Sequence, residues 1–205
     1  DSRLDQVDSI TKSKKKTYIQ VELVGDDAIL DTDAILVLKD SRTDLILKDL
    51  EFVETRLGRA EDEQEKLLLN KLKSILEKEA FIFNAAFLEE EKKLMSGYGL
   101  CTNKPVCVAE KNDLENLDNL LAGCLLESGF ISFFTTGEKE TRAWLIKKET
   151  TAWEAAGQVH SDIQRGFIRA EIISFSDFIQ AGGETQVKQA GKLRLVQKDY
   201  IMQDG

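Results

Sequence analysis

The sequence predicts an α/β fold in three parts, and three observations support this prediction. Two runs rich in β-branched residues, 18–24 and 33–38, are typical of strands in an α/β sheet. A long span from about 44 to 94 has helical periodicity and contains no proline. From about residue 129 onward, short β-type runs alternate with short helical stretches, which indicates a small α+β module.

The N-terminal residues predict one helix followed by a basic loop. Leu4, Val7 and Ile10 recur at helical spacing and would form one apolar face. Four lysines then follow within residues 12–16. Such a charge run is more often a solvated loop than a contact for phosphates, and we expect a loop here.

Apolar residues in the 44–94 span recur every three or four positions, which places them on one side of each helix. The two stripes are Leu50, Val53 and Leu57, and Leu68, Leu72 and Ile75. Acidic residues and lysines occupy the remaining faces, as on the solvated side of a coiled coil. The span therefore predicts a helical hairpin.

The elements after this hairpin are shorter. Pro105, the only proline in the chain, introduces a predicted strand at 106–108. A leucine stripe predicts a helix at 114–128, which Gly129 ends. The last part of the chain predicts strands at 131–134, 144–146, 167–173 and 193–196, and helices at 152–160 and 175–179.

Composition narrows the class of protein. Of 205 residues, 42% are hydrophobic and 32% are charged, as in globular proteins, and no apolar run is long enough to cross a bilayer. The three cysteines form no CxxC pair, so reduced thiols are expected. The net charge of −9 argues against a basic surface over the whole protein. Residues 135–205 are nevertheless balanced in charge, which leaves room for a local basic surface.

Recognisable catalytic motifs are scarce. His160, the only histidine, has no His or Cys neighbours that would complete a zinc site, so no metal site is predicted. It also lacks a nucleophile at a readable spacing, and we interpret it as a structural or binding residue. No string of the form GxxxxGK(S/T) occurs, so the phosphate-binding loop of a P-loop enzyme is not visible.

Ordered strings in the last 75 residues resemble the Obg-like ATPases of the YchF type, which belong to the P-loop GTPase superfamily. These strings are residues 133–144 (FFTTGEKETRAW), 155–162 (AAGQVHSD), 165–171 (RGFIRAE) and 198–205 (KDYIMQDG). Weaker similarity follows the same family order upstream, through residues 1–5, 14–16, 21–24, 43–51 and 100–105. The P-loop and the glycine-rich switch II segment of that family have no counterpart in the sequence.

The resemblance implies three domains. Residues 1–43 and 99–128 would form a P-loop-type nucleotide domain, incomplete in this chain. Residues 44–98 would form an inserted helical coiled-coil domain, and residues 129–205 a C-terminal TGS domain of β-grasp type. The implied function is binding and hydrolysis of ATP, or of GTP, with Mg²⁺, in association with the ribosome or RNA. We expect a cytoplasmic monomer that does not bind a membrane, and no catalytic residue is assigned.

One part of the nucleotide site can be assigned from the resemblance. The family reads the base with a motif of NxxE type, expected after Pro105. Cys107, Val108 and Glu110 are its candidate remnant, with cysteine where asparagine is expected. Alternatively, these residues belong to a later strand of the nucleotide domain. The preceding Asn103-Lys104-Pro105 lacks the aspartate of a guanine-reading NKxD motif and is not assigned.

The TGS resemblance also implies contact with the ribosome or RNA. The candidate contacts are Arg142, Lys147, Arg165 and Arg169. The interleaved aromatic residues are expected to fill the core of the module, because a small domain needs large side chains inside. The alternative function is a non-catalytic ribosome- or RNA-binding module, a helical arm with a TGS domain, that binds no nucleotide.

Overall fold

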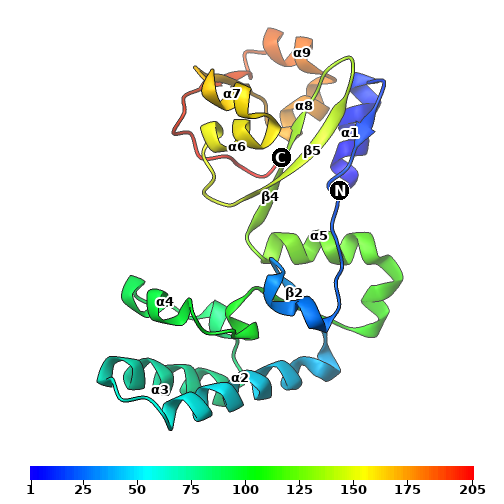
Figure 1. Cartoon of the computed structure of the whole chain (residues 1–205). Helices are drawn as coiled ribbons and strands as arrows, with labels where there is room; N and C mark the ends of the chain where they lie inside the picture. Colours follow the sequence, from blue (N-terminus) through cyan, green and yellow to red (C-terminus); the bar gives the residue numbers. More distant parts are fainter. The chain divides into compact units, whose positions relative to one another are not determined.

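The computed structural model describes residues 1–205, and their contacts divide the chain into two units (Figure 1). The terminal unit combines both ends of the chain, Asp1–Val21 and Gly129–Gly205. The middle unit is the continuous segment Glu22–Ser128.

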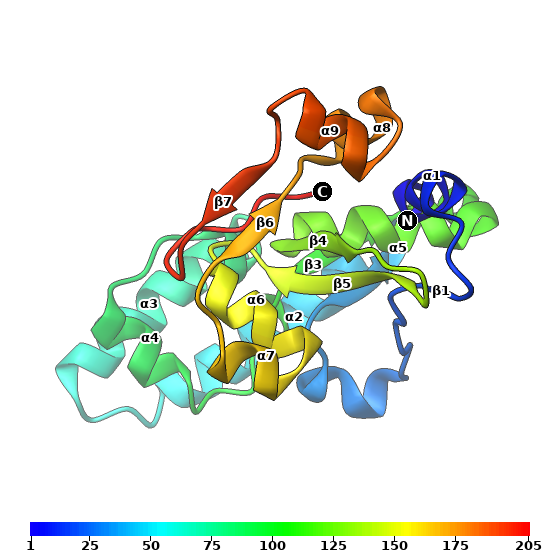
Figure 2. The same ribbon diagram turned by 90° about the horizontal axis from the view of Figure 1, so that it is seen from above.

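The terminal unit is built around the antiparallel hairpin of β4 (Phe130–Thr135) and β5 (Thr141–Lys147). The short strand β1 (Lys16–Thr17) adds to β5 in parallel, so the strand order is β1-β5-β4. Figures 1 and 2 show helix α6 (Ala152–Val159) beside β5, and the short helix α7 (Ser161–Arg165) packs on α6. Ile131 and Ile146 face each other across the hairpin and pack on Ala155 of α6.

A second small sheet completes this unit. Strands β6 (Ala170–Ile172) and β7 (Arg194–Val196) pair antiparallel. Two helices lie between them in the sequence, α8 (Phe175–Ala181) and α9 (Glu184–Gln189). The sequence pattern predicts the strands and α8 but not α7 or α9, which have five and six residues. So short a helix shows little more than one turn of periodicity.

Helix α1 (Ser2–Thr11) joins the N-terminus to the C-terminal part of the chain. Its buried residues Leu4 and Val7 lie on a face that contacts α8 and β5. Arg3 Nη1 also lies 2.7 Å from the carboxylate of Asp204. Residues 1–21 therefore pack with the C-terminal part and not, as the resemblance implied for residues 1–43, with residues 99–128. The physical reason is that the apolar face of α1 and the edge of β5 cover each other.

The middle unit combines a two-stranded parallel sheet with a helical layer. Strand β2 (Ile35–Leu38) pairs in register with β3 (Val106–Ala109). The helices are α2 (Arg42–Leu57), α3 (Glu63–Glu77), α4 (Glu89–Met95) and α5 (Leu117–Glu127). Short 3₁₀ turns connect them, at Asp26–Asp31, Lys39–Ser41, Ile82–Asn84, Cys101–Asn103 and Lys111–Asn116.

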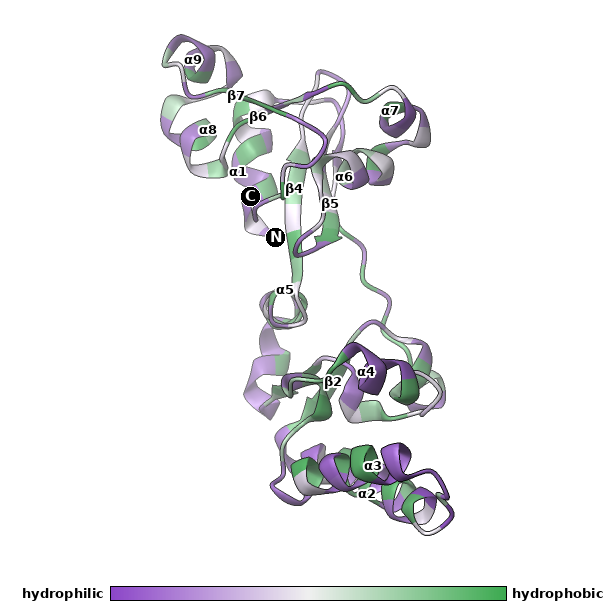
Figure 3. Ribbon diagram, turned by 90° about the vertical axis from the view of Figure 1, so that its left-hand side faces the viewer, coloured by the Kyte–Doolittle hydropathy of each residue, from purple (hydrophilic) through white to green (hydrophobic).

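The predicted helical hairpin is confirmed as α2 and α3, which cover residues 42–77. The rest of the predicted span, 78–98, holds a 3₁₀ turn and the separate short helix α4 and does not continue the hairpin. Of the predicted stripes, Val53, Leu68 and Leu72 are buried in one apolar cluster, while Leu50, Leu57 and Ile75 are half-buried against it. In Figure 3 the ribbons of α2 and α3 change repeatedly between hydrophilic and hydrophobic colours, in keeping with one buried face on each helix. None of the helices has the length and the apolarity needed to cross a membrane.

A buried carboxylate links the helical layer to the sheet. Asp49 on α2 is only 1% exposed and accepts the backbone N–H groups of Cys101 (2.9 Å) and Thr102 (2.7 Å). These are the first residues of the turn that leads into β3. Asp49 thereby satisfies two N–H groups at the start of a helical turn, where the backbone offers no partner of its own.

The predicted strand at 18–24 is wrong. Only Lys16 and Thr17 pair with another strand, and Val21, Leu23 and Val24 are exposed. A parallel strand of this composition is stable only with a neighbouring strand and covered faces. Residues 18–24 have neither, so the β-branched residues do not form a strand here.

Candidate functional site

The carboxyl ends of β2 and β3 meet at one edge of the parallel sheet. Leu38 pairs with Ala109, so the residues that follow each strand lie next to each other. Lys39 Nζ is 2.8 Å from Glu110 Oε1, and Lys111 Nζ is 3.2 Å from Asp40 Oδ2. These crossed ion pairs line a hollow of about 370 Å³. In open α/β sheets, ligands bind at this edge.

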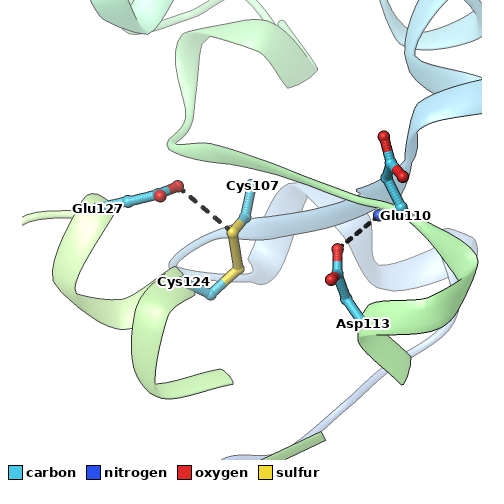
Figure 4. The surroundings of a disulfide bond; sticks show 5 residues. All are labelled: Cys107, Glu110, Asp113, Cys124 and Glu127. Carbon is cyan, nitrogen blue, oxygen red and sulfur yellow. Dashed lines mark hydrogen bonds between the residues drawn. A yellow bond between two sulfur atoms is a disulfide. The ribbon is translucent and has the colours of Figure 1, made fainter. Parts of the chain in front are cut away.

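Glu110 contacts two other residues near this edge, Asp113 through its backbone and Lys39 through its side chain. Its backbone N–H donates to Asp113 Oδ2 at 2.8 Å, which starts the turn Lys111–Asn116 (Figure 4). Its side chain is 62% exposed, and its hydrogen bond with Lys39 raises the pKa of that lysine. The carboxylate can therefore accept hydrogen bonds from a ligand at the edge.

Cys107 is directed into the protein. It forms a disulfide bond with Cys124 of α5, as Figure 4 shows, with the two Cα atoms 5.5 Å apart. The expectation of three reduced thiols is thus wrong, because α5 packs on β3 at a distance that suits a disulfide. Only Cys101 keeps a free thiol.

The three candidates for base recognition are thus placed differently. The disulfide occupies the sulfur of Cys107, and Val108 presents an apolar side chain on the exposed face of β3. Glu110 alone brings polar side-chain atoms to the hollow. Lys39 and Asp40 were not predicted as site residues from the sequence. The signal available was their position directly after a predicted strand at 33–38, since parallel strands end at one edge.

The residues at this edge do not fit a nucleoside triphosphate with Mg²⁺. A phosphate cradle needs a glycine-bearing turn between a strand and a helix, and Lys39, Asp40, Glu110 and Lys111 stand at these turns instead. No group of three or more His, Cys, Asp or Glu side chains in the 205 residues could hold a metal ion. What the edge offers is a carboxylate that can accept from the amino group of a nucleobase.

A second candidate surface lies on the terminal unit. The Arg142 guanidinium carbon lies 4.0 Å from the centre of the Trp144 ring, within the range of a cation–π interaction. Trp144 in turn stacks on Phe133, with ring centres 6.3 Å apart and planes 15° apart. The Trp144 Nε1–H donates to Thr135 Oγ1 at 2.9 Å, which fixes the ring. Arg142 is held by stacking and makes no ion pair.

The other three candidate cations differ in their surroundings. Lys147 is exposed at the end of β5, with its ammonium 5.9 Å from the centre of the Phe130 ring. Arg165 pairs with Asp162 on the same short helix, which neutralises its charge. Arg169 is exposed before β6. Because side chains alternate along a strand, Arg142 and Lys147 point to opposite faces of β5. The structure therefore does not gather the four cations on one face.

The expectation for the aromatic residues holds in part. Phe133 packs against the small core of Ile131, Ile146 and Ala155, as expected for a residue that fills the module. Trp153, in contrast, is 41% exposed, although its Nε1–H donates to the carbonyl of Gln164 at 3.1 Å.

His160 has a structural position. Its Nδ1 accepts the backbone N–H of Asp162 at 3.0 Å and so caps the N-terminus of α7. The side chain is exposed, and its Nδ1 also lies 3.5 Å from the carboxylate of Asp162. This geometry supports the interpretation of His160 as a structural residue.

Charge divides the chain into two very different parts. The terminal unit carries 15 Lys and Arg against 13 Asp and Glu, a net charge of +2. The middle unit carries 13 Lys and Arg against 24 Asp and Glu, a net charge of −11. A polyanion such as RNA is therefore repelled by the middle unit and tolerated by the terminal unit.

Comparison with known proteins adds independent findings. Residues 130–205 match the family "YchF-GTPase_C: Protein of unknown function (DUF933)". The chain is similar to the "Ribosome-binding ATPase YchF" of Bacillus subtilis, at 31% identity over 84% of this chain and 65% of the relative. Its similarity to the protein of that name in Buchnera aphidicola subsp. Schizaphis graminum is 33% identity, over 96% of this chain and 58% of the relative.

A solved structure shows the same fold. The Schizosaccharomyces pombe YchF GTPase matches with a TM-score of 0.71 at 19% identity, over 100% of this chain and 84% of that one. The chain spans only 58% to 65% of the length of the two curated relatives. The match with the Bacillus subtilis relative extends over 238 residues, more than the 205 of this chain. That relative therefore has internal residues without a counterpart here.

Proposed function

Because the chain belongs to the YchF family of Obg-like ATPases in the P-loop GTPase superfamily, we propose that the complete protein binds and hydrolyses ATP and associates with the ribosome. Relatives of similar sequence bear the name ribosome-binding ATPase, which supports both parts of the proposal. Phosphates and Mg²⁺ would be bound by segments that these 205 residues do not contain. GTP is the alternative substrate.

The domain assignment proposed from the family is adjusted to the structure. The helical hairpin of α2 and α3 is proposed as the coiled-coil domain. Residues 129–205 are proposed as the TGS-like β-grasp domain, to which residues 1–21 are added. The remainder of the middle unit, with β2, β3 and α5, is proposed as the partial nucleotide domain. We also propose that this protein acts as a monomer in the cytoplasm, because its proposed partner is the ribosome.

The ribosome contact is proposed for the terminal unit. One observation carries it: Arg142 is held over Trp144 and makes no ion pair, on the unit whose net charge is positive. A guanidinium fixed in this way can pair with an RNA phosphate without first breaking an ion pair, or stack beside an unpaired base. Lys147 and Arg169 would add charge around it.

The test is co-sedimentation with ribosomes. Arg142→Gln is expected to lower the fraction of the chain that pellets with ribosomes by about fivefold, since a phosphate contact is lost. Arg165→Gln is the matched control, because Asp162 already neutralises that arginine. Equal effects of the two substitutions would show that Arg142 has no special role, and failure of the unaltered chain to pellet would refute the ribosome contact.

A second candidate function is supported by the carboxyl edge of β2 and β3. The residues there do not fit phosphates, which favours a non-catalytic ribosome-binding module for the chain as it stands. Titration of this chain with ATP and with GTP, with and without Mg²⁺, separates the two functions. Binding that needs Mg²⁺ favours the hydrolase. Ribosome pelleting without any nucleotide binding favours the module.

A further inference from the structure

Helix α5 has the weakest apolar packing of the longer helices in the middle unit. Five of its eleven residues are leucine, yet Cys124 is its only buried residue. Leu117 and Leu126 are 40% and 49% exposed. No residue of α5 belongs to the apolar cluster that packs α2 against α3. Burial of an apolar face is the usual source of stability for a helix in a protein, and it contributes less to α5 than to those two helices.

A disulfide bond supplies a covalent link in place of this packing. The one buried residue of α5, Cys124, is bonded to Cys107 of β3, 17 positions earlier in the sequence (Figure 4). A cross-link of this span acts mainly on the opened chain, whose freedom it restricts, and it shifts the opening equilibrium by a factor on the order of 100. The bond therefore holds α5 on the sheet where few apolar contacts do.

The surroundings of the disulfide also suit the reduced state. Glu127 Oε2 lies 3.6 Å from Cys107 Sγ, as the dashed line in Figure 4 shows. If the bond is reduced, the S–H of Cys107 can donate to this carboxylate, because a thiol is a weak donor and a carboxylate a good acceptor. A buried thiol with an acceptor beside it is not left unpaired, so this position can accommodate both oxidation states.

The proposed location of the protein favours a bond that is broken and remade. In the cytoplasm, structural disulfides are rare, and those that form are usually transient and redox-sensing or catalytic. A dithiol reductant can break this bond: one of its thiolates attacks one cysteine sulfur, and its second thiol displaces the mixed disulfide. The dithiol is oxidised to its own disulfide, while two electrons and two protons leave Cys107 and Cys124 as thiols.

We infer that the Cys107–Cys124 disulfide is a redox-sensitive latch that holds α5 on β3 when oxidised and releases the helix when reduced. The turn Lys111–Asn116 connects β3 to α5, so release of the helix also loosens this turn. Glu110, which contacts Lys39 at the carboxyl edge, stands at the start of that turn. Opening of the latch requires neither a nucleotide nor a ribosome, and it therefore goes beyond the proposed function.

Hydrogen–deuterium exchange of the full chain tests the latch. One sample is oxidised with glutathione disulfide and the other is reduced with dithiothreitol. The hydrogen-bonded amides of α5 are expected to exchange at least about tenfold faster after reduction, because the opened chain is no longer cross-linked. The amides of α3, which packs in the apolar cluster, are the internal control and should change by less than about twofold.

Two cysteine variants provide the matched comparison. Cys124→Ser cannot form the bond, and its α5 amides should exchange at the fast rate with or without dithiothreitol. Cys101→Ala is the control, because Cys101 is the free cysteine and takes no part in the latch. This variant should keep the full response to reduction. A response lost equally in both variants would overturn the inference.

Thiol counting shows whether the bond itself exists. The oxidised and the reduced chain are unfolded and labelled with N-ethylmaleimide, and mass spectrometry should find one labelled cysteine in the former and three in the latter. Three labelled cysteines after treatment with glutathione disulfide would overturn the inference. Equal exchange of α5 in the oxidised and reduced chains would also overturn it, and so would an equal acceleration in α3, which indicates general unfolding.

Discussion

The middle unit and the terminal unit are stabilised in different ways. The middle unit has one apolar cluster that includes Val53, Leu69, Leu72 and Ile82, each fully buried. The terminal unit has two small clusters, one around Ile131 and one around Phe167, and joins its distant segments with polar contacts. The comparison teaches that a continuous segment can rely on one core, whereas a unit assembled from both chain ends depends more on hydrogen bonds.

The largest effect is expected in the middle core. Leu72→Ala should lower the free energy of unfolding by about 3 kcal/mol, because Leu72 is fully buried and the cavity is surrounded by other leucines. Urea unfolding followed by circular dichroism measures it. Leu67→Ala on the same helix is the control, since Leu67 is 71% exposed. Similar losses for both variants would contradict the single-core account.

A somewhat smaller effect is expected for Asp49. Asp49→Ala leaves the N–H groups of Cys101 and Thr102 buried without acceptors and should cost about 2 kcal/mol. Glu51→Ala, at an exposed position of the same helix, should change the stability by less than about 0.5 kcal/mol. The same unfolding experiment measures both, and a neutral Asp49→Ala would mean that the turn finds other partners.

In the terminal unit, a buried hydroxyl cluster tests the role of polar contacts. Thr141 is fully buried, and its hydroxyl lies 2.8 Å from that of Thr11 and 2.6 Å from that of Ser13. Thr141→Val keeps the shape but leaves those hydroxyls with one partner fewer, at a cost of about 1 kcal/mol.

Faster proteolytic cleavage within residues 12–21 should accompany this loss. Thr185→Val is the control, because Thr185 is exposed and makes no side-chain hydrogen bond. If cleavage rates of the two variants agree, the N-terminal segment is held by its apolar contacts alone.

The smallest expected effect is on the pH dependence of stability, and it comes from Glu65 in the middle unit. Glu65 accepts from Arg56 Nε and from the Tyr98 hydroxyl, both at 2.7 Å, and these hydrogen bonds lower the pKa of Glu65. The pKa of Glu65 is lower in the folded state than its unfolded value of 4.5. The hydrogen bonds of Glu65 therefore contribute to the free energy of unfolding above that unfolded pKa, and this contribution is lost as the pH falls through the folded-state pKa.

Melting temperatures measured downward from pH 5 should therefore fall less steeply for Glu65→Gln than for the unaltered chain. Glu63→Gln is the control, because Glu63 is 82% exposed. Parallel profiles for the unaltered chain and Glu65→Gln would show that the contact does not contribute.

Sequence patterns predicted the elements whose signal is local. The leucine stripes of α2 and α3, the strand after Pro105 and the two strands β4 and β5 were predicted to within a few residues, although the pairing of β4 with β5 was not. The strand at 18–24 failed because strand formation depends on a partner that the local sequence does not specify. The docking of α1 on α8 depends on residues more than 160 positions apart, which no periodicity reveals.

The candidate sites show the same limit. Glu110 was proposed from a motif, but its partner Lys39 is 71 positions away and follows from the register of β2 and β3. The close approach of Gln164 to Gly157 of α6 likewise depends on how two short helices pack, which no local pattern reveals. The disulfide of Cys107 and Cys124 could not be deduced either, because three cysteines at irregular spacing allow several pairings.

The pairing of β1 with β5 has a consequence for synthesis of the protein. Lys16 and Thr17 leave the ribosome well before their partners Thr141 and Arg142, with the whole of Glu22–Ser128 translated between them. At typical elongation rates of about 5 to 20 residues per second, this delay lasts on the order of 5 to 25 seconds. During that time Leu4 and Val7 lack the residues of β5 and α8 that cover them in the folded unit.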